Sequence, residues 1–99
     1  MTIRKYRDGE ALVIALSGRL DTETTRELEK EVRNSLDGVT ELVFDFANLS
    51  YITSAGLRAL LTAYRIMQQK KGTMRVTNSN EIVREVFEVT GFSGLLPVE

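Results

Sequence analysis

ELVFDFANLSYITSAGLR, residues 41–58, is the stretch from which the organisation of this chain is most readily inferred. Its first six residues are rich in aromatic and β-branched side chains, as is typical of a strand. A polar loop beginning at Asn48 follows, and the small residues from Thr53 to Gly56 stand where an apolar helix begins. A strand followed directly by a helix is the building unit of a sheet with parallel strands. We therefore expect an α/β fold.

The residues before this stretch predict a hairpin. Residues 2–6 and 11–16 flank Asp8-Gly9, a pair that tolerates positive φ and favours a tight turn. The second run, ALVIAL, is apolar throughout, which suits a strand that is buried on both faces. Gly18 is expected to end this strand.

Two helices are predicted on either side of the strand at residues 41–46. The first starts at Asp21, a favourable capping residue, and is closed by Gly38. Leucine and valine recur every four residues along it, at Leu28, Val32 and Leu36. The second helix opens at Thr53 to Gly56 and ends before Gly72, and its expected buried side consists of Leu57, Leu60, Leu61, Tyr64 and Met67.

The C-terminal residues continue the alternation. TMRVT, residues 73–77, reads as a strand, and Asn78 with Glu81 has the spacing of a helix capping box. The third helix is expected to bury Ile82, Val83, Val86 and Phe87. Residues 95–98 are expected to add a short last strand, which Pro97 confines to an edge of the sheet.

The predicted order is β-β-α-β-α-β-α-(β), within one domain covering residues 1–99. Strands that are separated by single helices pair in parallel, whereas the N-terminal hairpin adds an antiparallel pair. We therefore expect a mixed sheet of four or five strands packed with three helices.

The composition excludes several classes of function. The 13 basic and 14 acidic residues give a net charge of −1, so nucleic acid and anionic membranes are not expected as partners. The chain has no cysteine and no histidine, which removes thiolate metal sites and the usual general base. Glycine-rich phosphate-binding motifs are absent, and no cofactor is expected. The N-terminus lacks a signal peptide, no run approaches a membrane span of ~20 residues, and a cytoplasmic location is expected.

The start of the second helix is the candidate site. We expect the small residues there to leave Ser54 exposed beside backbone N–H groups that have no partner within the helix. Such a terminus stabilises anions, so a phosphoryl group on Ser54 is compatible with the helix. On local sequence alone, the simple helix cap is the favoured interpretation of Ser54, and likewise of Asp21.

The chain resembles a STAS domain of the anti-sigma factor antagonist family. GRLD at residues 18–21 follows a buried strand, as does the G-x-L-D of that family. LVFDFANLSYITSAGLRALL resembles the family's apolar strand, polar turn and S-x-G-L helix start. A further strand, a capped helix and the pair Gly91-Phe92 complete a resemblance that spans nearly the whole chain. Thr53 stands where many phosphorylated relatives have aspartate.

The resemblance implies a partner-switching protein. The unphosphorylated form would bind an anti-sigma factor with serine kinase activity, phosphorylation would release it, and a serine phosphatase would restore binding. Ser54 matches the phosphoacceptor, and Asp21 matches an aspartate that lies close to it in relatives. The predicted partner-binding residues are Asp21, Asn48, Thr53, Ala55, Gly56, Leu57 and Arg58.

Two alternatives remain open at this stage. The same fold could serve, without phosphorylation, as an accessory subunit of another complex such as a lipid-transport ATPase. An enzyme with Ser54 as nucleophile would need a nearby base, and without histidine only Asp21, Asp45 or a lysine is available. We therefore expect a binding module that is not an enzyme.

Overall fold

Four strands form one mixed sheet in the order β1-β2-β3-β4, in a computed structural model that describes residues 1–99. β1 is antiparallel to β2, whereas β3 is parallel to both of its neighbours. The elements are β1 (Thr2–Asp8), β2 (Ala11–Leu20), α1 (Thr22–Ser35), β3 (Glu41–Ile52), α2 (Ser54–Gln69), β4 (Thr73–Thr77), α3 (Glu81–Thr90) and a 3-10 turn (Phe92–Gly94). The predicted α/β class and element order are confirmed.

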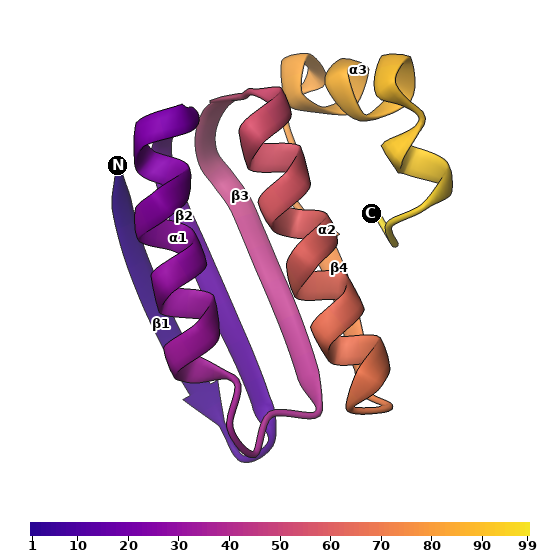
Figure 1. Cartoon of the computed structure of the whole chain (residues 1–99). Helices are drawn as coiled ribbons and strands as arrows, with labels where there is room; N and C mark the ends of the chain where they lie inside the picture. The colour runs from indigo at the N-terminus through magenta and orange to yellow at the C-terminus, as the bar shows by residue number, and fades with distance from the viewer.

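The long helices α1 and α2 lie side by side over the same face of the sheet (Figure 1). This arrangement makes burial alternate along β2: Leu12, Ile14 and Leu16 are buried, whereas the residues between them are half-buried. The expectation that this strand is buried on both faces is therefore wrong. Its outward-facing residues are apolar, but no long helix packs on them.

Both central strands are longer than the sequence predicted. β2 continues through Gly18, which has φ +101°, and its pairing with β3 is irregular on either side of this residue. β3 likewise runs to Ile52, so residues 48–52 form a strand where a loop was expected. The hairpin is confirmed, but its two loop residues are Gly9 and Glu10, because Asp8 pairs with Ala11.

α2 is rotated relative to the predicted apolar side. Leu57, Leu60 and Met67 are buried as expected, and Ala63 joins them. Leu61 is only half-buried, as is Tyr64. The helix thus faces the sheet with a stripe that includes a small residue, since Ala63 lets the helix lie close to the strands.

α3 also differs from the prediction at its start. Its N-cap is Asn80, whose Oδ1 accepts from the Val83 N–H at 2.8 Å. Asn78 adopts a left-handed φ of 62° and donates to Asp45, so the predicted Asn78–Glu81 capping box does not form. Val83 and Phe87 are buried, but Ile82 is 56% exposed.

The chain ends beside β4. Instead of a fifth strand, a single parallel bridge joins Val76 to Val98, and the Val76 N–H donates to Pro97 O at 2.9 Å. Leu96 is buried against the core. None of the three helices combines the length and the apolar character needed to cross a membrane.

Because α2 is rotated, replacing each of two neighbouring leucines by alanine should lower the free energy of unfolding by a different amount. Leu60→Ala should lower the free energy of unfolding by about 2–5 kcal/mol, because the fully buried side chain leaves a cavity. Leu61→Ala should cost less than about 1.5 kcal/mol, since Leu61 is half-buried. Urea titration of both variants measures the difference, and equal losses would contradict this placement of the helix.

Candidate functional site

The ends of β2 and β3 and the starts of α1 and α2 meet at one end of the sheet (Figure 1). The backbone N–H and the hydroxyl of Thr53 both donate to Leu20 O, at 2.9 and 3.2 Å. Leu20 is followed directly by Asp21. These two bonds therefore bring the predicted Asp21 next to the start of α2, although 31 residues of chain separate Asp21 from Thr53.

Gly56 lets the first turn of α2 lie directly on the strand ends. A Cβ atom at this position would lie 2.8 Å from Leu20 Cγ and 2.9 Å from Ile52 Cγ1, closer than such atoms pack. Glycine is needed at position 56 for lack of space and not for an unusual backbone conformation, because Gly56 has ordinary helical geometry. Any larger residue here would push the start of α2 away from the sheet.

Ser54 is the first residue of α2 and is exposed, with Thr53 as the N-cap. The Thr53 side chain bonds to Leu20, and no side chain accepts from the N–H groups of the first turn. The alternative in which Ser54 acts as the helix cap is therefore wrong. Because α1 and α3 are capped by Asp21 and Asn80, α2 is the one helix whose first-turn donors have no side-chain partner.

Asp21 caps α1, as the local sequence predicted. Its Oδ1 accepts from the N–H groups of Glu23 and Thr24 at 3.1 and 3.0 Å, and its own N–H donates to the Thr24 hydroxyl at 2.9 Å. The hydrogen bonds that the carboxylate accepts, first from the Thr24 N–H and next from the Thr24 hydroxyl, lower the pKa of Asp21 below the ordinary value for aspartate. Asp21 thus places a charged carboxylate beside the start of α2 at neutral pH.

The other predicted partner-binding residues divide into exposed and buried positions. Arg58 is exposed one turn after Ser54, and Ala55 is half-buried. Leu57 is 2% exposed and Gly56 is buried, so both lie beneath the surface and position the helix. Asn48 is exposed but pairs with Ser17, further back along β3 than the residues that lead into Ser54.

The structure adds a pair of residues that the sequence reasoning missed. Arg19 lies opposite Tyr51 in the β2–β3 ladder, and its guanidinium carbon is 5.6 Å from the centre of the Tyr51 ring. Tyr51 is 39% exposed, three residues before Ser54. An exposed aromatic residue in a polar segment was the available signal, but its pairing depends on the irregular register of the two strands.

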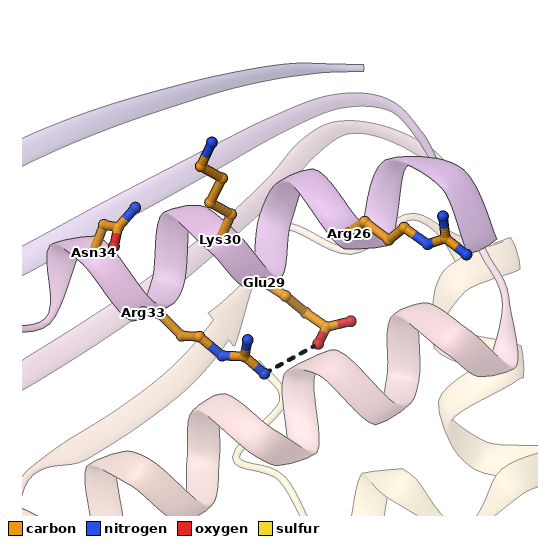
Figure 2. A pocket seen from close by; sticks show the side chains of 5 residues that line it. All are labelled: Arg26, Glu29, Lys30, Arg33 and Asn34. Atoms are coloured by element: carbon orange, nitrogen blue, oxygen red, sulfur yellow. Dashed lines mark ion pairs between the residues drawn. The ribbon is translucent and has the colours of Figure 1, made fainter.

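A shallow hollow of the surface lies away from this site, along α1. It is lined by Arg26, Glu29, Lys30, Arg33 and Asn34. Figure 2 shows their side chains pointing in different directions, with only Arg33 and Glu29 paired, at 3.7 Å. These are exposed charges on a helix surface, and no group of three or more acidic side chains is placed to hold a metal ion.

Comparison with known proteins identifies the family of this chain and solved structures with the same fold. The family described as the STAS domain matches residues 2–99. BtrV of Bordetella bronchiseptica, assigned as an anti-sigma factor antagonist, is 35% identical over 88 residues, or 88% of this chain and 76% of BtrV. The anti-sigma factor antagonist SpoIIAA has the same fold. Its unphosphorylated form superposes with a TM-score of 0.86 at 23% identity, covering 99% of this chain and 88% of SpoIIAA. Its phosphorylated form gives 0.77 at 22% identity, covering 99% and 91%.

The close approach at Gly56 predicts that even a methyl group is disruptive there. Gly56→Ala should lower the free energy of unfolding by about 1–3 kcal/mol, because overpacking exceeds the gain of up to about 1 kcal/mol in helix propensity. The control is Gly94→Ala, where a Cβ meets nothing within 4 Å and should be nearly neutral. A Gly56→Ala variant as stable as the parent in thermal unfolding would refute the contact.

The lowered pKa of Asp21 predicts an acid-dependent contribution to stability. Since the folded state holds the proton less tightly than the unfolded state, the contribution is complete above the unfolded pKa and disappears as pH falls through the folded pKa. Asp21→Asn retains a capping oxygen but no charge. The stability difference between the parent and this variant should be constant above about pH 5 and shrink below about pH 4. A difference independent of pH in denaturant titrations would contradict the assignment.

Proposed function

The chain belongs to the STAS domain family, and we propose that within it the chain is an anti-sigma factor antagonist that switches partners through phosphorylation of Ser54. The single observation that carries this proposal is the geometry of Ser54, an exposed hydroxyl on the first residue of a helix that lacks a side-chain cap. The name of BtrV, and of SpoIIAA in its unphosphorylated and phosphorylated forms, supports it.

In the proposed cycle, the unphosphorylated surface around Ser54 binds an anti-sigma factor that is also a serine kinase, which frees a sigma factor. Transfer of a phosphoryl group to Ser54 ends this binding, and a serine phosphatase restores it. The proposed surface consists of exposed and half-buried residues at one end of the sheet: Asp21, Thr53, Ser54, Ala55 and Arg58, with Arg19 and Tyr51 beside them. Such a role places the chain in the cytoplasm.

The physical basis of release is a change of charge without a change of fold. A phosphate adds about −1.5 to −2 charges at pH 7 where the surface had a neutral hydroxyl. The free N–H groups of the first turn can donate hydrogen bonds to the phosphate oxygens, so α2 tolerates the group. The partner, however, was complementary to the hydroxyl and to the nearby Asp21 carboxylate. It must desolvate the added charge or dissociate, and ~3 kcal/mol of penalty weakens binding more than a hundredfold.

The geometry around Ser54 gives little support to the hypothesis that the chain is an enzyme with this serine as nucleophile. A serine nucleophile needs a base within hydrogen-bond reach to take its proton. Of the predicted bases, Asp21 accepts from the N–H groups of Glu23 and Thr24, which lower its pKa. Asp45 accepts from the Ala47 N–H and from the Asn78 side chain. We therefore propose a binding role. An accessory subunit of a lipid-transport ATPase would use the same fold but would not depend on the charge at Ser54.

The switch predicts opposite behaviour for two substitutions of Ser54. Ser54→Ala should bind the anti-sigma factor kinase of the source organism as tightly as the unphosphorylated parent does, and should keep this affinity after incubation with ATP, when the parent loses it. Ser54→Asp should bind at least about tenfold more weakly, because a carboxylate supplies part of the phosphate charge. Isothermal titration measures affinity, and intact-mass spectrometry should find one phosphate on the parent and none on Ser54→Ala.

The matched control is Gln69→Glu, which adds the same charge at the other end of α2. Gln69 is exposed, and its variant should bind like the parent. Phosphate on another residue, or undiminished binding by the chain phosphorylated at Ser54, would refute the switch and favour the accessory-subunit alternative.

A further inference from the structure

α3 carries an apolar stripe on its exposed surface, beside the face that it buries. Ile82 is 56% exposed, Val89 is 79% exposed, and Val86 between them is half-buried. Their spacing of four and three residues places them on one side of the helix. They line a shallow groove together with Glu85 and Thr90. The core uses a different side of α3, through Val83 and Phe87, so this stripe contributes nothing to the packing of the domain.

A row of carboxylates borders the stripe. Glu81, Glu85 and Glu88 have the same four- and three-residue spacing as the aliphatic residues, and each directly precedes one of them in the sequence. None of the three takes part in an ion pair; the four ion pairs of the structure lie elsewhere. The only basic residue of α3 is Arg84. The groove is therefore apolar on its floor and negatively charged along one side.

α3, which carries the groove, lies at the same end of the sheet as the proposed Ser54 surface (Figure 1). The Asn80 side chain, which caps α3, also donates to Leu49 O at 3.1 Å, in the part of β3 that leads into Ser54. The Phe87 ring stacks on Phe46 of the same strand, with centroids 6.5 Å apart. α3 is thereby fixed at the end of the sheet where α2 begins (Figure 1). A partner seated over Ser54 has the groove within reach.

The charge of the groove selects among possible occupants. An anionic membrane surface or a nucleic acid would meet the glutamate row and be repelled. A second copy of the chain, with its α3 packed antiparallel on this one, would bring the two glutamate rows together on the same side. A protein segment with apolar side chains toward the stripe and lysine or arginine toward the glutamates satisfies both features of the groove.

We propose that the α3 groove is a second docking surface for the anti-sigma factor, occupied by an amphipathic segment of that partner with a basic flank. The inference rests on the proposed function only in the identity of the occupant. The groove keeps its shape and charge whether or not Ser54 is phosphorylated. It thus provides affinity and orientation, while Ser54 provides the switch.

The groove itself is tested with two synthetic helical peptides, one of leucine and lysine and one of leucine and glutamate in the same amphipathic pattern. The leucine–lysine peptide should shift the amide resonances of residues 81–90 in NMR titrations, and the leucine–glutamate peptide should not. Ile82→Ser combined with Val89→Ser should weaken binding about tenfold, with folding retained because both side chains are exposed. Glu27→Lys on α1 is the control and should leave binding unchanged. Shifts centred on α1, or equal binding of both peptides, would overturn the proposal.

The occupant is tested with the anti-sigma factor kinase. The Ile82→Ser, Val89→Ser chain should bind it about tenfold more weakly than the parent and still be phosphorylated on Ser54 when the kinase is in excess. If the parent binds and this variant binds equally well, the inference is wrong while the proposed function stands. If the parent itself does not bind the kinase, the proposed function fails and the anti-sigma factor is excluded as the occupant of the groove. The peptide titrations alone then decide whether the groove docks a basic segment. Self-association of the parent that is lost in the variant would also overturn the proposal.

Discussion

The first turn of α2 lies in direct contact with the ends of β2 and β3, and the arrangement of the site depends on this contact. It is possible because Gly56 has no side chain where Leu20 and Ile52 fill the space. Two hydrogen bonds from Thr53 to Leu20 O hold the approach from the other side. Because Leu20 leads into Asp21, the same contact that seats α2 also places the start of α1 next to it. The surface is thus a consequence of core packing at one end of the sheet.

This packing leaves one helix start chemically different from the others. Asp21 and Asn80 use their side chains to satisfy the N–H groups of α1 and α3, whereas the Thr53 hydroxyl is turned to Leu20. The donors of the α2 first turn therefore remain available to an anion on the adjacent residue, which is Ser54. A covalent phosphate there receives local stabilisation and still changes the charge of the surface. In the proposed function, phosphorylation therefore weakens partner binding without unfolding the domain.

The order of elements could be predicted because it depends on local signals such as the capping residue Asp21 and the apolar run at 11–16. The rotation of the helices could not, since Leu61 and Ile82 are as hydrophobic as the buried residues beside them and only packing against the sheet decides which are covered. The strand at 48–52 was missed because its polar residues pair with Ser17 to Leu20 through an irregular ladder. For the same reason the contact between Arg19 and Tyr51 was not foreseen. Ser54 was identified through family resemblance, which local sequence could not replace.

The central claim is that phosphate on Ser54 is accommodated by α2 and acts only on the surface. The most direct test compares the amide NMR spectra and thermal unfolding of the chain before and after stoichiometric phosphorylation of Ser54. We expect shifts concentrated at residues 53–58 and around Asp21, dispersed signals elsewhere that do not move, and a Tm changed by no more than a few degrees. Shifts spread through the sheet together with a large fall in Tm would contradict it, because the phosphate would then act by disrupting the fold.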